Sequence, residues 1–460
     1  MNRKDFLQKL SWTASASGLL FAQNKSWAVT PSTESKPQNS SSSKKAIVMG
    51  AGLSGLYSAY LLKQTGYEVT IIDRSERLGG RIFTYKDKTT GLVQDLGAEW
   101  IGEGQSDIKS LVRQLGLELK VSPHVKRFQI RSDEESLIKI AGPSVETLEK
   151  VIDLHKSLSE SQKQGLDKIN FASYARYQGL AEDEVKSISE CFRIFFGEDL
   201  NQISSEAVLG DLASAESALR PQYYVSGGAE KIISSLAAKL GDSEISLGDP
   251  IVKVTQLKNY AQVELASGKI HKAGLVICTL PAAAVLDIKW TPGLPKDLLY
   301  SALRMQTGKI TKNIIICKKK DAIAPKIINT DTPGQTFYVS GEEAIGENQF
   351  LLTSLATGDR AGLLEKGSDS QKKALLKLSL SEIKNADWEE FGESPFVFHS
   401  FQKYTGRRGF VSIFPPGSLG TKEVWAEPYE RVFFAGEHLA KHNGSMDAAV
   451  ASAIQAISRT

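Results

Sequence analysis

The stretch AIVMGAGLSGLYSAYLLKQTGYEVTIID, residues 46–73, decides the fold. It opens with a short apolar run, residues 46–49, of the kind that forms a buried parallel strand. Three glycines in the pattern G-x-G-x-x-G follow at once: Gly50, Gly52 and Gly55. Apolar side chains then recur at helical spacing until Gly66, and a second apolar run ends in Asp73. The stretch therefore predicts a strand–turn–helix–strand unit.

The glycine spacing in this unit is that of a dinucleotide-binding turn. The first glycine makes the turn tight, the second lets a pyrophosphate approach the backbone, and the third lets the helix pack on the strand. The free N–H groups and the dipole at the helix N-terminus favour the negative phosphate. Asp73 is placed to accept hydrogen bonds from both hydroxyls of an unphosphorylated adenosine ribose. A glycine turn that binds nothing is the alternative, and the complete unit argues against it.

The size and composition are those of a two-domain globular enzyme. A chain of 460 residues exceeds what one core usually holds, and its 41% apolar and 24% charged residues are ordinary values. A net charge of +3 with scattered Lys and Arg shows no nucleic-acid footprint. The 3 cysteines lie far apart, which excludes a disulfide framework and a C-x-x-C zinc site. His438 and His442 have the spacing of a helical metal pair, but no third ligand is apparent, so a structural role is favoured.

The N-terminal segment precedes the predicted fold. Residues 1–28 combine a positive start, a mildly apolar run and a small-x-small pattern, which predicts a cleaved export signal. NRKDFLQK, residues 2–9, resembles a twin-arginine signal with Lys4 at the second arginine, so we expect a periplasmic protein. A general secretory signal and an uncleaved cytoplasmic tail are the alternatives. The apolar run is too short for a membrane span, and residues 29–43, rich in Ser and Pro, predict a flexible linker.

A second glycine pair distinguishes an FAD-binding unit from an NAD-binding unit. DRSERLGGRIFT, residues 73–84, places Gly79 and Gly80 before Arg81. The two glycines allow a second close backbone approach, and Arg81 offers a bidentate fork to a phosphate, which an NAD-binding unit does not need. This spacing resembles the flavoprotein group that contains monoamine and polyamine oxidases, L-amino-acid oxidases, phytoene desaturases and protoporphyrinogen oxidase.

Four further segments resemble the same flavin-containing amine oxidase family, in the same order along the chain. They begin at residues 93 (VQDLGAEW), 223 (YYVSGGAEK), 248 (GDPIVKV) and 430 (ERVFFAGEHLAKHNGSM). The resemblance implies an α/β fold in which a Rossmann-like FAD-binding domain is interleaved with an α+β substrate-binding domain. The FAD-binding domain would take residues 44–120, 221–288 and 404–460, and the substrate-binding domain residues 121–220 and 289–403.

The resemblance also implies which residues contact FAD. Ile251 would touch the adenine through its backbone, Glu437 would lie near the ribityl chain and phosphates, and the helix that follows Gly444 would face the pyrimidine end of the flavin. The full predicted set is Gly50, Gly52, Ser54, Gly55, Asp73, Arg74, Gly79, Gly80, Arg81, Gly97, Ala98, Glu99, Trp100, Ile251, Gly436, Glu437 and Met446.

Few reacting side chains are expected, because the cofactor carries the redox chemistry. The family's recurrent polar group is a lysine that holds a water at flavin N5. MQTGKITKNIIIC, residues 305–317, places Lys312 at that position. Lys309 is the rival if the register slips, and a surface lysine is the alternative without the resemblance.

The segment YTGRRGFVSIFPPGS, residues 404–418, bears on the flavin linkage and the substrate pocket. The matching monoamine oxidase segment carries a cysteine that bonds the flavin. No cysteine follows Cys317 here, so FAD should be non-covalent. Monoamine oxidases also frame the substrate between two aromatic rings, which map to Phe410 and Ser445, so half of that cage survives. A core role for Phe410 is the alternative.

The segment DLGAEW, residues 95–100, bears on the substrate class. L-amino-acid oxidases of the family often place an arginine after this glycine pair to hold a carboxylate, whereas this chain has Glu99. Glu99 can attract a cationic amine, which favours amines over amino acids. Hydrogen bonding of Glu99 to backbone beside the flavin is an alternative role. Arg407 and Arg408 are candidates for carboxylate binding from another direction.

The resemblance implies oxidation of a small amine by hydride transfer to flavin N5, followed by hydrolysis of the imine. O₂ would reoxidise the flavin and give H₂O₂, or another redox acceptor would serve. An L-amino-acid oxidase and a C–C desaturase are alternatives on the same fold, and a non-catalytic binding protein is an alternative of another class. The oligomeric state stays open, with a homodimer as one arrangement.

Overall fold

The computed structural model describes residues 44–460. Its description omits residues 88–90, 92, 123–129, 132–137, 140–141, 215–220, 319–327, 341–348, 382–395 and 402–408. The predicted export signal, the predicted linker, Arg407 and Arg408 therefore lie outside the described residues. In the part of the chain that is described, no helix combines the length and apolar character needed to cross a bilayer.

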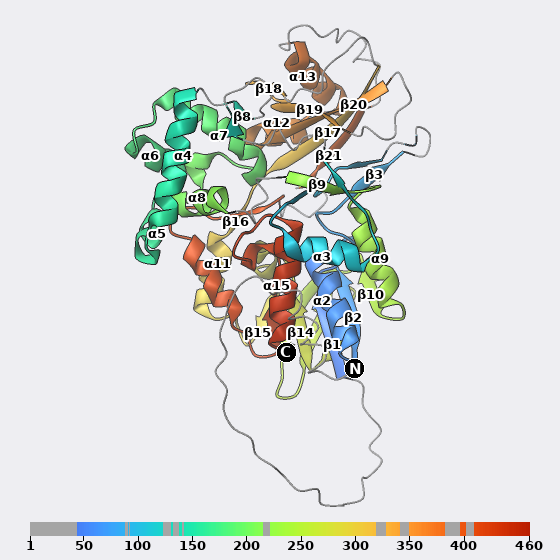
Figure 1. Ribbon diagram of the computed structural model, residues 1–460. Helices are drawn as coiled ribbons and strands as arrows, with labels where there is room; N and C mark the ends of the chain where they lie inside the picture. The colour runs from blue at the N-terminus through green and yellow to red at the C-terminus, as the bar shows by residue number, and fades with distance from the viewer. Residues whose placement is uncertain are drawn as a thin grey trace, which may run out of the picture.

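A five-stranded parallel sheet forms one end of the molecule (Figure 1). Its strand order β10-β2-β1-β14-β23 is that of a Rossmann-type sheet and confirms the predicted α/β class. The strands are β1 (Lys44–Met49), β2 (Tyr67–Asp73), β10 (Glu244–Leu247), β14 (Leu275–Cys278) and β23 (Val432–Phe434). Strands from both ends of the chain thus meet in one sheet, and their carboxyl ends share one edge.

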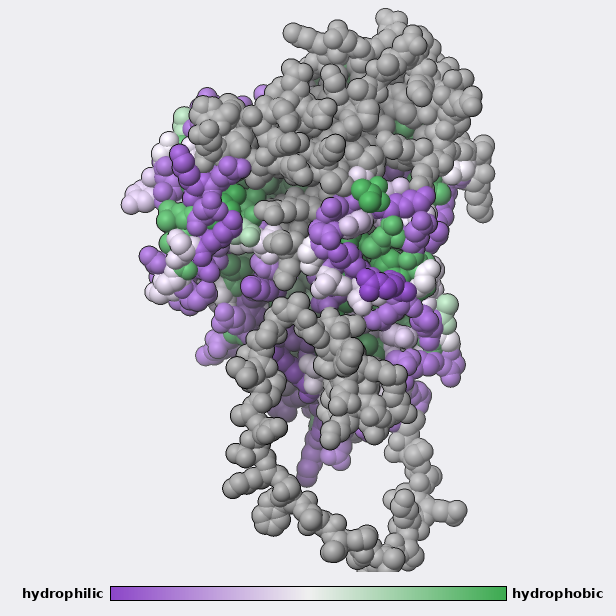
Figure 2. All heavy atoms as spheres, viewed as in Figure 1, coloured by the Kyte–Doolittle hydropathy of each residue, from purple (hydrophilic) through white to green (hydrophobic). Residues whose placement is uncertain are grey.

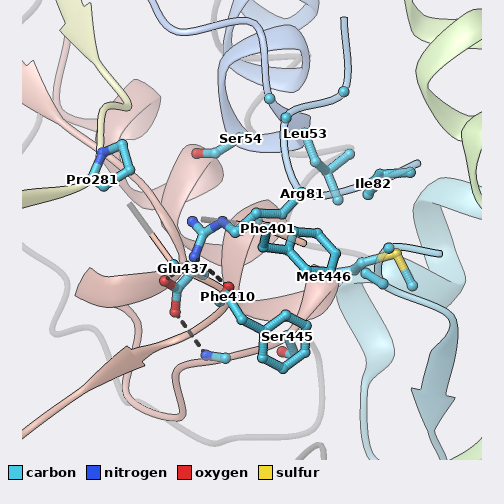
Figure 3. Close-up of a pocket in the computed structure, with 18 of the residues that line it drawn as sticks. Leu53, Ser54, Arg81, Ile82, Pro281, Phe401, Phe410, Glu437, Ser445 and Met446 are labelled. Atoms are coloured by element: carbon cyan, nitrogen blue, oxygen red, sulfur yellow. Dashed lines mark hydrogen bonds and ion pairs between the residues drawn. The ribbon is translucent and has the colours of Figure 1, made fainter. Parts of the chain in front are cut away.

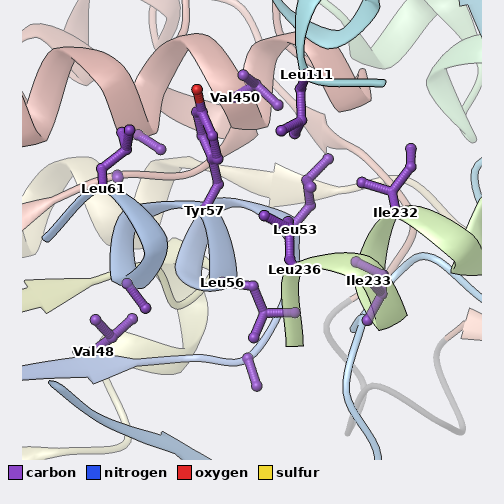
Figure 4. Close-up of a cluster of buried hydrophobic side chains, with 14 of the residues drawn as sticks. Val48, Leu53, Leu56, Tyr57, Leu61, Leu111, Ile232, Ile233, Leu236 and Val450 are labelled. Atoms are coloured by element: carbon purple, nitrogen blue, oxygen red, sulfur yellow. The ribbon is translucent and has the colours of Figure 1, made fainter. Parts of the chain in front are cut away.

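Helices α2 (Leu53–Gln64), α3 (Ser106–Gln114), α9 (Glu230–Leu240) and α15 (Met446–Ser458) share one hydrophobic core with this sheet. Figure 4 shows Leu56 and Val48 in the layer between α2 and β1, with Ile233 and Leu236 approaching from α9. Full burial of one such side chain contributes about 2 kcal/mol. Helix α2 ends where Gly66 adopts a positive φ of 86°, as the sequence predicts for its C-terminal cap.

A second sheet packs near the parallel sheet, in the order β13-β12-β11-β15. It contains β11 (Ile251–Gln256), β12 (Ala261–Leu265), β13 (Ile270–Ala273) and β15 (Lys289–Thr291), and α10 (Ala282–Val285) and α11 (Lys296–Arg304) follow nearby. Residues 289–305 were assigned from the sequence to the substrate-binding domain. In the structure β15 pairs with β11, and Leu298 and Met305 belong to a core cluster that these two sheets share.

An antiparallel sheet forms the opposite end of the molecule, in the order β18-β19-β20-β17-β21 (Figure 1). Its strands are β17 (Ile310–Lys318), β18 (Ile328–Asn329), β19 (Thr336–Ser340), β20 (Gln349–Thr357) and β21 (Phe396–Ser400). Helices α12 (Gly358–Lys366) and α13 (Asp369–Ser381) follow β20, and α13 packs on one face through Leu376 and Leu380. The other face contributes to the cavity described below.

A cluster of helices flanks the antiparallel sheet. It comprises α4 (Gly142–Ser157), α5 (Glu160–Leu166), α6 (Phe171–Tyr177), α7 (Glu182–Phe196), the short 3-10 helix η2 (Leu200–Gln202) and α8 (Ser205–Ala213). These helices share a core of their own around Phe192 and Leu209. Over α4–α6, Figure 2 shows mainly hydrophilic side chains with small separate hydrophobic areas.

Short strands connect the larger parts. They are β3 (Thr84–Lys86), β4 (Val93–Asp95), β5 (Trp100–Gly102), β6 (Leu119–Val121), β7 (Ile130–Arg131), β8 (Ile138–Lys139), β9 (Pro221–Val225), β16 (Gln306–Thr307) and β22 (Ser412–Ile413). The 3-10 helices η4 (Leu419–Ala426) and η5 (Glu437–Leu439) lie on either side of β23 in the chain. Strand β9 lies between β5 and β6, and β16 pairs with β22.

Candidate active site

A cavity of about 250 Å³ extends from the carboxyl edge of the parallel sheet to the antiparallel sheet. It brings together nearly all of the residues predicted from the sequence, and Ile251, on β11, is the exception. The predicted residues that line it are Gly50, Gly52, Ser54, Gly55, Asp73, Arg74, Gly79, Gly80, Arg81, Gly97, Ala98, Glu99, Trp100, Lys312, Phe410, Gly436, Glu437, Ser445 and Met446.

The glycine turn closes one end of the cavity. Gly50 adopts a positive φ of 110°, which favours glycine, and its N–H donates to Ile72 at 2.8 Å. A Cβ on Gly55 would lie 1.9 Å from the Gly50 carbonyl oxygen, so only glycine allows this approach of helix to strand. A Cβ on Gly52 would meet nothing within 4 Å. The space beside Gly52 is therefore open to a ligand, as a pyrophosphate requires.

The start of α2 presents polar groups to this open space. Ser54 lines the cavity, and its buried hydroxyl has no hydrogen-bond partner among the described residues. Gly52, the N-cap residue, contributes no side-chain hydrogen bond, so the first N–H groups of the helix stay available. Asp73 accepts from the N–H groups of Ala51 and Ser75, at 2.7 and 2.8 Å, and this fixes its carboxylate beside the turn. These residues fit the phosphates and ribose of a dinucleotide.

Arg81 and Glu437 join the two ends of the chain across the cavity (Figure 3). The Arg81 guanidinium donates to Glu437 at 2.6 Å and to the Phe410 carbonyl at 3.0 Å. Glu437 also accepts from the Ser412 hydroxyl at 2.6 Å and from the Gly444 N–H at 2.8 Å. Burial raises the pKa of the Glu437 carboxyl, but the Arg81 charge, His438 and these hydrogen bonds outweigh burial and lower it overall.

Lys312 lies on β17 with 4% of its surface exposed and pairs with Glu99. The Tyr338 hydroxyl donates to the same Glu99 oxygen at 3.2 Å, and the Gln94 amide donates to the other oxygen at 3.2 Å. The expectation of a Glu99 free to attract a cationic amine is therefore wrong, because Lys312 already neutralises it. Among the described residues, the hydrogen-bond partners of the Glu99 carboxylate are side chains, and the alternative contact with backbone is not seen there.

A second carboxylate, Asp95, lies behind this pair. It accepts from the Thr84 hydroxyl and from the Ala229 N–H, so it holds α9 against the β3–β4 hairpin. Burial, followed by the charge of Glu99, raises the pKa of the Asp95 carboxyl to about 7, although Thr84 and Lys312 oppose the shift. The sequence did not single out Asp95 as a titrating group, because its burial depends on tertiary packing.

Four aromatic side chains surround the end of the cavity nearest Lys312. The rings of Trp100 and Tyr338 lie 5.6 Å apart, and those of Phe401 and Phe410 lie 5.3 Å apart. The Lys312 ammonium is 5.9 Å from the Trp100 ring centroid and 6.0 Å from that of Tyr338. Phe410 packs against a core cluster and also lines the cavity. Sequence reasoning missed Tyr338 and Phe401.

Ser445, the non-aromatic member of the predicted pair, has a structural contact as well. Its hydroxyl accepts from the Ala448 N–H at 3.0 Å and so caps α15. Figure 3 places Ser445 next to Phe410, with Met446 nearby. The N-terminus of α15 thus faces the cavity, as the sequence predicts.

Contacting glycines bring α7 against the strand that carries Lys312. The Lys309 N–H donates to the Gly197 carbonyl at 2.7 Å. A Cβ on Gly308 would lie 1.9 Å from the Phe196 carbonyl oxygen, so the two backbones touch. Lys309, the alternative to Lys312, does not line the cavity, and Lys312 does. The observed register therefore places Lys312 in the cavity lining.

Other lining residues come from segments with no recognised motif. Ile194 and Phe195 come from α7, and Thr279, Leu280 and Pro281 follow β14. The position of the latter three after a buried parallel strand was a usable signal, because ligands bind at the carboxyl edge of such sheets.

The histidine pair has no metal partner among the described residues. His442 pairs with Asp211 at 3.3 Å. Burial lowers the pKa of the His438 imidazole to about 4. In the described part of the chain no cluster of His, Cys, Asp and Glu could hold a metal ion.

Known proteins match both the sequence and the fold. Residues 53–457 match the family model described as flavin containing amine oxidoreductase. An L-amino-acid oxidase from Mus musculus is 25% identical over 458 residues, covering 92% of this chain and 71% of that protein. Amine oxidase B from Homo sapiens is 24% identical over 444 residues, covering 88% of this chain and 83% of that protein.

Solved structures share the fold over nearly the whole chain. Wild-type putrescine oxidase bound to putrescine has a TM-score of 0.76 at 20% identity, covering 91% of this chain and 98% of its own. Cyclohexylamine oxidase from Brevibacterium oxydans has a TM-score of 0.75 at 17% identity, with the same coverage of 91% and 98%.

Proposed function

This chain belongs to the flavin-containing amine oxidoreductase family, and we propose that it oxidises a small amine with a non-covalently held FAD. One observation carries the proposal: a single cavity runs from the open glycine turn at Gly52 to the buried Lys312. The family match fixes the reaction class, an oxidation of amines. The cofactor linkage, the electron acceptor and the roles of individual residues are the parts proposed here.

The chain's own residues would bind the cofactor along this cavity. The N-terminus of α2 and the Ser54 hydroxyl would bind the pyrophosphate, with Arg81 as a second phosphate donor. Asp73 would accept from the adenosine ribose, and the N-terminus of α15 would face the pyrimidine end. None of the described residues that line the cavity is a cysteine, which supports non-covalent binding. The adenine contact of Ile251 stays a prediction.

The bound flavin would accept a hydride from the carbon that bears the amine and pass its electrons to O₂, giving H₂O₂, or to another acceptor. The protein supplies orientation and an apolar enclosure. Trp100, Tyr338, Phe401 and Phe410 form an aromatic surface that would hold the apolar part of the substrate. Lys312, fixed by Glu99, whose carboxylate also accepts from Tyr338, would keep an ordered N–H donor at the reacting end.

Two measurements test this function. A purified sample should absorb in the blue, and acid precipitation should release the flavin into the supernatant if the bond is non-covalent. A panel of amines and L-amino acids, followed by peroxide release and in parallel by reduction of a dye acceptor, should give turnover with amines. A colourless folded sample, or turnover confined to amino acids or to C–C desaturation, contradicts the proposal.

We also propose that the chain is exported, on the basis of residues 1–28 alone. A reporter fused to these residues should reach the periplasm of a bacterial host, and should fail to do so in a host without the twin-arginine translocase. Export that persists in that host assigns the general secretory route, and retention in the cytoplasm in both hosts contradicts export.

A further inference from the structure

Glu99 sets the charge of the cavity at its reacting end. Its carboxylate is hydrogen-bonded by donors from three strands: Gln94 on β4, Lys312 on β17 and Tyr338 on β19. Its side chain is 16% exposed and that of Lys312 is 5% exposed, so solvent screens the pair little. Glu99 and Lys312 both line the cavity, and their formal charges cancel there.

An uncompensated Lys312 would make this end of the cavity a carboxylate site. A buried ammonium beside the Trp100 and Tyr338 rings, without Glu99, would attract an anionic group strongly in a medium of low dielectric. With Glu99 in place, an entering carboxylate meets no net positive charge from the pair and faces the Glu99 oxygens as well. A neutral amine meets no such repulsion.

We propose that Glu99 is a specificity-determining residue that excludes substrates with a carboxylate next to the amine. The inference rests on the proposed function and deepens it, because it assigns the enzyme to amines without an α-carboxylate instead of amino acids. Glu99 acts by cancelling the charge of Lys312, and does so from a fixed position. Specificity built on an unpaired charge or a like charge is a general means of rejecting the wrong ligand.

The test uses two aromatic probes of similar shape, benzoate and benzyl alcohol, titrated into the oxidised holoenzyme by calorimetry. Four proteins form a charge cycle: wild type, Glu99→Gln, Lys312→Met and the double variant. Asp95 could ionise and replace the lost charge, so the cycle is repeated in an Asp95→Asn background. Benzyl alcohol carries no charge and reports any change in cavity shape.

The expected change in benzoate affinity depends on whether the substitution removes a negative or a positive charge. Glu99→Gln should bind benzoate about tenfold more tightly than wild type, a change of about 1.4 kcal/mol. Lys312→Met should bind it more weakly, and the double variant should return to within about threefold of wild type if the effect is one of charge. Benzyl alcohol should bind all four proteins alike.

Several results would overturn the proposal. One is tight binding of benzoate by the wild type, which a site built from Arg407 or Arg408 would give. Another is equal affinity of all four proteins for benzoate. A third is a change in benzyl alcohol affinity that follows the change in benzoate affinity. The proposed function fails separately, by absence of flavin or of amine turnover, because the calorimetric cycle does not depend on turnover. Activity gives a second readout: Glu99→Gln should raise turnover of L-phenylalanine relative to phenethylamine.

Discussion

The buried carboxylate of Glu437 provides a stability test of the join between the two chain ends. Glu437→Gln keeps the shape but removes the charge that pairs with Arg81. It also replaces one acceptor oxygen with an NH₂ group, which would face the N–H of Gly444 or the donors of Ser412 and Arg81. Removing one partner of a buried ion pair costs about 3–5 kcal/mol. Arg81 is 26% exposed and recovers some hydration, so we expect the lower end, about 3 kcal/mol.

The assay is urea unfolding of the flavin-free protein, so that cofactor binding does not enter. The unfolding entropy of a chain of this length is roughly 0.9 kcal/mol/K. A loss of about 3 kcal/mol in the free energy of unfolding should therefore lower Tm by about 3 °C. Glu427→Gln, on the exposed surface, is the matched control and should change the free energy of unfolding by less than about 0.5 kcal/mol.

The effect should also depend on pH with a defined sign. The pKa of Glu437 is lowered in the folded state, so its stabilisation is present above the ordinary glutamate pKa. That stabilisation is lost as the pH falls through the folded pKa, and the gap between wild type and Glu437→Gln should narrow in acid. A variant as stable as wild type at pH 7, or a gap that widens in acid, refutes this account of the site.

Three further predictions concern the cavity. Lys312→Met should lower amine turnover at least about tenfold while the blue absorbance of the flavin remains, and unchanged turnover would remove Lys312 from the reaction. Gly52→Val should reduce the flavin content with little loss of stability of the flavin-free protein, because the new side chain enters open space. Gly55→Ala should impair folding itself. Equal thermal unfolding of the two variants would contradict this distinction. Asp95 has a folded pKa raised to about 7, so the folded state binds the proton more tightly and stability should fall as the pH rises from about 4 to 7. Asp95→Asn should flatten that fall in urea titrations, and an unchanged slope would contradict the raised pKa.

The parts of the site that could be predicted from sequence are those fixed by local backbone geometry. The glycine turn and the second glycine pair lie within one segment with Arg81, and a close backbone approach in the turn requires glycine. The segment around Glu437 was found because its motif stands next to a strand and a helix start. Of the residues that the sequence predicts to contact FAD, all except Ile251 line one cavity.

The parts that could not be predicted depend on contacts between distant segments. Glu99 and Lys312 are separated by 213 positions, so their pairing, which decides what Glu99 can do, has no local signal. Tyr338 and Phe401 reach the cavity only because β19 and β21 belong to one sheet with β17. The parallel pairing of β15 with β11 likewise leaves no trace in the periodicity of either strand.

The direct backbone contact of Gly197 with the segment at Gly308 has a consequence for the evolution of the pocket. Because Lys309 hydrogen-bonds to Gly197 with no side chain between them, the helical layer and the lysine-bearing strand are held at a fixed spacing. Enlarging either glycine would push the two backbones apart and so shift the strand that carries Lys312 as well as the pocket wall. Variation that tunes the enzyme to new amines should therefore accumulate in side chains along the wall, such as Ile194 and Phe195, while this contact stays constant.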